Sequence, residues 1–124
     1  MEIDNVRQAL QIYFDVMYEC DLDKFDLIFH PTSSLFTMKN GEFNLRPFSQ
    51  YRSEIATRTS PKSILQPRVD EILQIGMLSP EIAFAQVRVR IFEKLFVDNL
   101  NLLKFDGCWM IVAKIFHHAE TIGA

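Results

Sequence analysis

Residues 95–118 read LFVDNLNLLKFDGCWMIVAKIFHH, two long runs of strand-forming residues separated by Asp106-Gly107. An Asp-Gly pair supplies the positive φ angles of a two-residue β-turn, so Leu95–Phe105 and Cys108–His118 are expected to form an antiparallel hairpin. Regular pairing from that turn gives these cross-strand neighbours: Phe105 with Cys108, Leu102 with Ile111, Leu100 with Ala113, and Asp98 with Ile115. This hairpin belongs to a β-sheet, and other parts of the chain must cover one face of it.

Helices are predicted before the long strands, because apolar residues recur there every three or four positions. They are expected at Ile3–Met17 with Asp4 as N-cap, at Leu22–Phe29 with Asp21 as N-cap and Pro31 as stop, and from Pro47 through Phe48, Tyr51 and Ile55. Further strands are expected at Leu35–Met38, Glu42–Leu45, Leu65–Ile75 and Ile82–Glu93, the first two joined by Asn40-Gly41. The order indicates an α+β fold in which three N-terminal helices cover one face of a curved antiparallel sheet.

The composition limits the classes of function. The 124 residues, 48% of them hydrophobic, predict a single domain, 1–124. No apolar run reaches the length of about 18 residues that a membrane span needs, and charges near the N-terminus do not resemble a signal peptide, so we expect a cytoplasmic protein. The net charge is -3 and the basic residues are scattered, which argues against nucleic acid as a partner. The spacing of Cys20, Cys108 and the three histidines predicts no metal site, and no cofactor is indicated.

Asp98 is the first candidate for a functional residue. In its strand, Asp98 shares a face with Leu100 and Leu102, and this face is the better candidate for the interior. An ionised carboxylate in an apolar interior is costly unless a partner, water or a ligand satisfies it. The expected register places His117 diagonally across from Asp98, with the small Ala113 leaving room beside it. A one-residue bulge would instead turn Asp98 outward.

Other side chains can complete a site around Asp98. Tyr13 lies on the apolar stripe of the first helix and carries a hydroxyl that needs a partner when buried, although it can equally be a core aromatic bonded to backbone. Met17 and Trp109 are expected to supply apolar wall. His30 is placed at the mouth of the pocket, with the alternative that it is a loop residue bonded to backbone.

The outer face of the sheet is unusually apolar for a monomer. The expected register puts these residues on it: Phe84, Phe92, Val97, Leu103, Met110, Val112 and Phe116. A contiguous apolar surface of this kind indicates a protein interface, so a homodimer through the outer sheet face is predicted.

The chain resembles the nuclear transport factor 2-like superfamily over nearly its whole length. The resemblance rests on the helix with Tyr13, Asp21-Leu22-Asp23 leading to Phe29-His30-Pro31, Ile82-Ala83-Phe84-Ala85, and Val97-Asp98-Asn99-Leu100 before Asp106-Gly107-Cys108-Trp109. The superfamily includes ketosteroid isomerases, scytalone dehydratases, SnoaL-like polyketide cyclases and a "putative lumazine-binding" group, to which the likeness is closest. The resemblance implies a cone-shaped fold with an internal pocket, a strongly curved sheet, and a homodimer joined through that sheet.

Ketosteroid isomerases pair a tyrosine with a protonated aspartic acid as an oxyanion hole and use a second aspartate as base. Tyr13 and Asp98 match the first two, whereas the position of the base falls at Thr37, whose hydroxyl cannot remove a carbon-bound proton near neutral pH. The resemblance thus implies a polar pocket without that isomerisation. The expected pocket residues are Tyr13, Met17, His30, Thr37, Tyr51, Val87, Asp98, Leu100, Trp109, Ala113 and His117.

Three functions remain open from the sequence. The first is a small-molecule-binding protein with an apolar pocket that carries a few polar groups. The second is a dehydratase, isomerase or cyclase acting on a small carbonyl or ring compound, in which Tyr13 and Asp98 polarise an oxygen and His30 or His117 moves the proton. The third is a homodimeric interaction module without a ligand.

Overall fold

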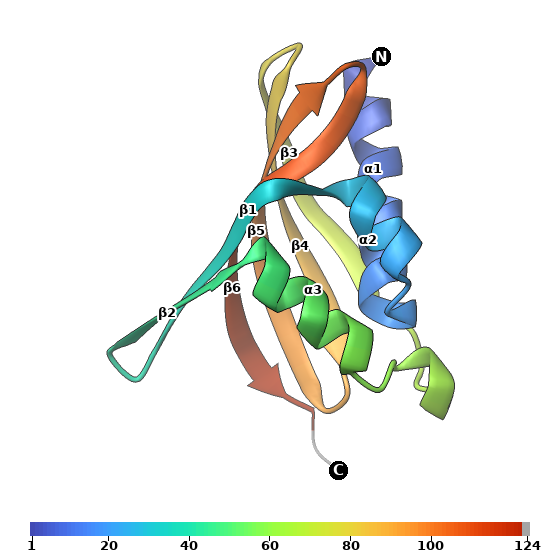
Figure 1. Cartoon of the computed structure of the whole chain (residues 1–124), viewed down its shortest axis with the longest axis vertical. Helices are drawn as coiled ribbons and strands as arrows, with labels where there is room; N and C mark the ends of the chain where they lie inside the picture. The colour runs from blue at the N-terminus through green and yellow to red at the C-terminus, as the bar shows by residue number, and fades with distance from the viewer. Residues whose placement is uncertain (123–124) are drawn as a thin grey trace.

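The computed structural model describes residues 1–122 (Figure 1). The helices are α1 (Glu2–Glu19), α2 (Leu22–Ile28), α3 (Phe48–Thr57) and a single 3-10 turn, η1 (Lys62–Ile64). The strands are β1 (Phe29–Lys39), β2 (Glu42–Pro47), β3 (Asp70–Ser79), β4 (Ile82–Ile91), β5 (Lys94–Phe105) and β6 (Cys108–Thr121). Three helices on one sheet confirm the predicted α+β fold.

The six strands form one mixed sheet in the order β2-β1-β6-β5-β4-β3, in which the β1–β6 pair is parallel and the other pairs are antiparallel. Figure 1 shows the three helices along one side of the curved sheet, with the β1–β2 hairpin projecting from the body as an arm. The concave face of the sheet is therefore covered by helices, and the convex face is left open.

The sequence explains where the helices begin and end. The Asp21 side chain accepts a hydrogen bond of 3.1 Å from the backbone N–H of Lys24, so it caps α2 as expected. Asp4 was expected to cap α1, but α1 begins earlier and Asp4 lies within its first turn. There its negative charge interacts favourably with the positive end of the helix dipole. In the residues described, no helix is long and apolar enough to cross a membrane.

Two strands, β1 and β3, begin several residues away from their predicted starts. β1 begins directly after α2, so His30 lies in a strand and not in a loop, and Pro31 falls in the interval where the pairing of β1 with β6 is irregular. β3 begins at Asp70 and not near Leu65, because η1 occupies part of the preceding segment.

The register of β5 with β6 decides the composition of the site. Phe105 pairs with Cys108 and Leu102 with Ile111, as predicted. The next pair is Asn101 with Ala113, so Val112 is an extra residue that forms a β-bulge in β6. The expected pairs of Leu100 with Ala113 and of Asp98 with Ile115 are therefore wrong.

The bulge exchanges the two faces of β6 beyond Val112. Lys114 is opposite Leu100 and Phe116 is opposite Asp98, so both lie on the concave face. Lys114 is 4% exposed, whereas its neighbour Ile115 is 52% exposed. Ala113, Ile115 and His117 face outward. The predicted interior positions of Ala113 and His117 are wrong for this reason, and Phe116 does not belong to the outer face.

Candidate functional site

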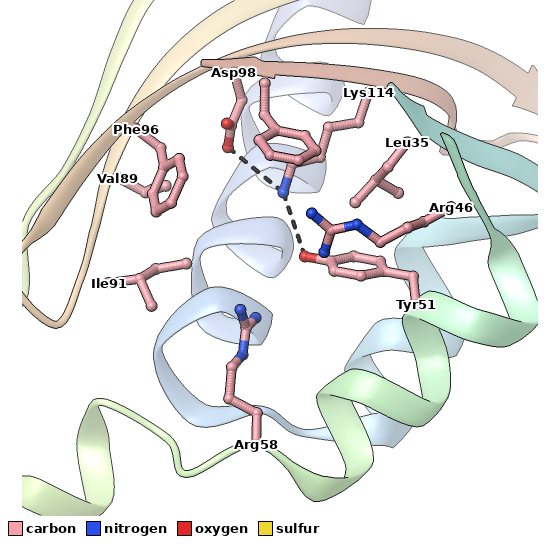
Figure 2. Close-up of a pocket in the computed structure, with 10 residues that line it drawn as sticks. Leu35, Arg46, Tyr51, Arg58, Val89, Ile91, Phe96, Asp98 and Lys114 are labelled. Atoms are coloured by element: carbon pink, nitrogen blue, oxygen red, sulfur yellow. Dashed lines mark hydrogen bonds and ion pairs between the residues drawn. The ribbon is translucent and has the colours of Figure 1, made fainter. Parts of the chain in front are cut away.

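A cavity of about 70 Å³ lies between α3 and the concave face of the sheet (Figure 2). The residues that line it are Leu35, Arg46, Tyr51, Arg58, Val89, Ile91, Phe96, Asp98, Lys114 and Phe116. They come from five strands, from α3 and from the residue that ends α3. Such a volume holds roughly five water molecules, so it accommodates a small molecule or one end of a larger one that enters through the mouth.

Asp98 is the acidic group of the cavity and is 1% exposed. Its Oδ2 accepts a hydrogen bond from the Tyr13 hydroxyl and lies 3.7 Å from Nζ of Lys114. Its Oδ1 is buried and has no hydrogen-bond partner among the described residues. One oxygen of the carboxyl group is thus satisfied by protein, while the other is left without a hydrogen-bond partner.

Lys114 is the buried counter-charge of Asp98. Its ammonium group donates to the Tyr51 hydroxyl at 3.3 Å and lies 5.2 Å from the ring centroids of both Tyr13 and Tyr51. Met17 completes this environment, with Sδ 3.8 Å from Nζ. A buried ammonium group requires such compensation, which here comes from a carboxylate, a hydroxyl and three aromatic faces, the third being the Phe116 ring at 5.8 Å.

Tyr13 contacts Asp98 without lining the cavity. Burial, together with the negative charge of Asp98, raises the pKa of Tyr13 well above its ordinary value of 10.0. The phenol therefore stays protonated and donates to Asp98. Tyr13 is fully buried and does not line the cavity, so its hydroxyl orients the carboxyl group and is not presented to a ligand.

Two arginines bring further positive charge to the cavity. Arg46, from β2, pairs with Glu54 at 2.8 Å and lies over the Phe116 ring at 5.0 Å. Arg58, at the C-terminal end of α3, points into the space below Asp98 and Lys114 (Figure 2). Its Nε and Nη2 are buried and make no hydrogen bond of normal geometry in the part of the chain that the structure describes. Burial lowers the pKa of Arg58, but the Tyr51 hydroxyl and the Cys20 thiol beside the guanidinium outweigh this effect and raise the pKa overall.

The remaining wall is apolar. Val89 and Ile91 of β4 and Leu35 of β1 lie around the polar groups. Phe96 and Phe116 face each other across neighbouring strands, with ring centroids 6.2 Å apart in an edge-to-face arrangement. The site thus combines a polar base with aromatic and aliphatic walls, the usual composition of a small-molecule pocket.

The structure brings only some of the predicted pocket residues together. Tyr51 and Asp98 line the cavity, while Tyr13 and Met17 contact its polar groups from outside the lining. Three further residues, Val87, Leu100 and Trp109, are buried in the core without lining the cavity. The Trp109 indole lies beside Glu2 near the start of α1, with Nε1 3.4 Å from Oε1.

The predicted residues Thr37, His30, Ala113 and His117 lie elsewhere. The Thr37 hydroxyl donates to the backbone carbonyl of Phe116 at 2.6 Å. Thr37 and His117 line an open groove beside the β1–β2 arm, not the cavity. The His30 ring stacks on Phe105, with centroids 4.1 Å apart, so it is not at the cavity mouth.

Sequence reasoning missed three cationic residues of the site: Lys114, Arg46 and Arg58. For Lys114 a signal was present, because it is the one charged residue in Cys108–Phe116. The two arginines carry no such signal, since each reaches the cavity from the end of a short element. Within residues 1–122, no cluster of three or more His, Cys, Asp or Glu side chains could hold a metal ion.

Comparison with known proteins places the chain in a family. The model of a family described as "Putative lumazine-binding" matches residues 1–117. No curated protein matches the chain.

Solved structures share the fold at low sequence identity. An NTF2-like protein of unknown function from Shewanella baltica is 21% identical, with a TM-score of 0.84 over 97% of this chain and 95% of that one. Another from Methylobacillus flagellatus is 21% identical, with a TM-score of 0.78 over 95% and 92%. A domain with a cystatin-like fold from Nostoc punctiforme is 12% identical, with a TM-score of 0.67 over 98% and 79%. The chain therefore belongs to the "Putative lumazine-binding" family and has the NTF2-like fold.

Proposed function

We propose that this protein binds a small organic molecule in the cavity between α3 and the sheet. The observation that carries the proposal is Oδ1 of Asp98, a buried acceptor in the cavity wall without a partner among the described residues. Leaving a buried charged acceptor unsatisfied costs about 1–3 kcal/mol or more. A ligand that donates a hydrogen bond to this oxygen removes that cost, which makes the cavity a binding site with a defined polar anchor.

The family description supports the same function. Lumazine is a flat heterocycle with N–H donors and carbonyl acceptors, and the cavity offers an acceptor on Asp98 and donors on Arg58. The aromatic pair Phe96 and Phe116 supplies apolar surface beside these groups. We propose binding without assigning a reaction, because the Tyr13 proton is committed to Asp98 and neither His30 nor His117 lines the cavity.

Binding is tested by calorimetry and thermal stabilisation of the full chain with lumazine and a panel of small heteroaromatic compounds. A compound at 100 times its Kd is expected to stabilise the fold by about 2.7 kcal/mol. For a neutral compound that donates a hydrogen bond to Asp98, Asp98→Asn removes the charge of the acceptor, so affinity should fall about tenfold. Asp26→Asn is the matched control, because Asp26 pairs with Arg52 on the surface. The proposal fails if no compound binds and the cavity of a crystal structure contains only ordered water.

We also propose a homodimer through the convex face of the sheet. The exposed apolar side chains there include Ile82 and Phe84 of β4 and Ile115 of β6, the last turned outward by the bulge. A face of this kind, with no helix over it, supports self-association more than it supports a solvated monomer. Phe92 does not contribute to this face, because it lies in the turn between β4 and β5 with a positive φ.

A cytoplasmic location is consistent with the chemistry of the cysteines. Cys20 and Cys108 are free thiols, and Cys108 is exposed. Because exposed free thiols persist in reducing compartments, they support the cytoplasm as the site of action.

A further inference from the structure

We propose that the molecule bound in this cavity is a monocarboxylic acid with a small apolar body, whose carboxylate is held by Arg58 beside Lys114. This inference rests on the binding function proposed above and specifies the chemical class of the ligand. It follows from the balance of charge in the cavity, from the unused edge of the Arg58 guanidinium, and from the position of Asp98.

The cavity carries an excess of positive charge. Its lining contains Arg46, Arg58 and Lys114 but a single carboxyl group, that of Asp98. Lys114 is paired with Asp98, and Arg46 is paired with Glu54. Arg58 takes part in none of the ion pairs found within residues 1–122. One positive charge in a largely buried position is therefore uncompensated by protein, and a single negative charge on a ligand would balance it.

The unpartnered atoms of Arg58 form the edge that grips carboxylates. Its Nε and Nη2 are both buried and without hydrogen-bond partners in the described part of the chain. Arg52, on the same helix, shows what this edge does, because its Nε and Nη2 hold the two oxygens of Asp26 at 2.8 Å each. Parallel N–H groups match the geometry of a carboxylate and make two charge-assisted hydrogen bonds to it. Figure 2 shows the Arg58 side chain pointing into the cavity, so a rotation of its guanidinium would present the same fork to a carboxylate bound there.

Asp98 limits the charge and shape of the ligand. Its carboxyl group lines the same small space, so a dianionic phosphate would be repelled more strongly than a monoanion. Its free Oδ1 only accepts, which favours a ligand with a hydroxyl or N–H group beside the acid. Ile91 and Phe96 provide apolar surface for the rest of the molecule.

Charge preference is tested with probes of matched shape. Calorimetry on the full chain compares benzoate with benzamide and propionate with propionamide, and adds inorganic phosphate. Each acid is expected to bind at least about tenfold more tightly than its amide, and more tightly than phosphate. In Arg58→Gln this preference should disappear. In Arg52→Gln, the matched change on the surface of the same helix, it should persist.

Arg58→Lys is the second variant. It keeps the positive charge but removes the fork. The affinity for the acids should therefore fall while remaining higher than the affinity for their amides. Equal affinity for acid and amide, an unchanged preference in folded Arg58→Gln, or a preference for phosphate would overturn the inference. If lumazine or another neutral heterocycle binds while the acids do not, the ligand class is wrong and the binding function stands. If neither acids nor neutral heterocycles bind, both proposals fail.

Discussion

The ammonium nitrogen of Lys114 lies 3.7 Å from Oδ2 of Asp98, and both side chains are buried on the concave face of the sheet. The two residues are brought together by the bulge at Val112, which turns Lys114 inward opposite Leu100. The pair holds the polar end of the cavity in place. The Tyr13 hydroxyl donates a hydrogen bond to Asp98, and Lys114 donates one to the Tyr51 hydroxyl.

Removing one member of the pair should destabilise the protein more than removing both. Lys114→Met leaves Asp98 as a buried charge without its partner, and we expect the free energy of unfolding to fall by about 3–5 kcal/mol. The double variant Lys114→Met/Asp98→Asn should recover much of that loss, because neither member of the pair is then left buried without the other. Urea unfolding measures both values. Arg88→Gln, which breaks the exposed pair with Glu71, is the control and should cost less than about 1 kcal/mol. Equal losses in the single and double variants would contradict an ion pair.

The sequence was sufficient to predict the final hairpin and its first pairs, because Asp106-Gly107 encodes the turn locally. It was not sufficient to predict the bulge at Val112, which coincides with the place where β6 also pairs with β1. One extra residue reverses the side chains that follow it as far as His118, so a correct turn still gave the wrong face for His117 and concealed Lys114. The burial of Asp98 could be predicted, because it depends on the alternation of side chains in β5, and the pairing of β5 with β4 is regular throughout. Arg58 could not be predicted, since its position depends on how the end of α3 packs over the sheet.

Deleting Val112 tests the bulge directly. In this register Ile111 and Lys114 face inward, so removal of one bulge residue restores strict alternation and leaves Lys114 opposite Leu100. We expect the deletion variant to fold and to keep its affinity for ligand. Deleting Ile115 instead shifts Phe116 and the residues after it to the opposite face, and should cost far more stability. Circular dichroism and urea unfolding compare the two variants. Similar losses in both would mean that Val112 is not a bulge residue.

Tyr13 should make the protein sensitive to alkali. Its pKa is raised in the folded state by burial and by Asp98, so folding stabilises the protonated phenol. That stabilisation is complete below the ordinary pKa of 10.0 and is lost as the pH rises above it toward the folded value. Tyr13→Phe removes the titrating group, so its stability should decline less than that of the wild type from about pH 9 to 11. At neutral pH the same variant should lose about 1.5–3 kcal/mol, the value of a hydrogen bond to a charged group. Urea unfolding across this pH range measures both effects, and parallel declines in the two proteins would contradict the assignment.

The convex face of the sheet should mediate self-association, and Ile115 is the most direct place to interrupt it. Ile115 is 52% exposed near the middle of the sheet, where β6 lies between β1 and β5. In a two-fold symmetric dimer a lysine at this position would be buried without a partner, so Ile115→Lys should be a folded monomer of 14.5 kDa. Leu27→Lys is the control, because Leu27 is 63% exposed on α2, away from this face. Sedimentation velocity at micromolar concentration should show a dimer for the wild type and for Leu27→Lys. A monomeric wild type, or a dimer that survives Ile115→Lys, would exclude this face as the interface.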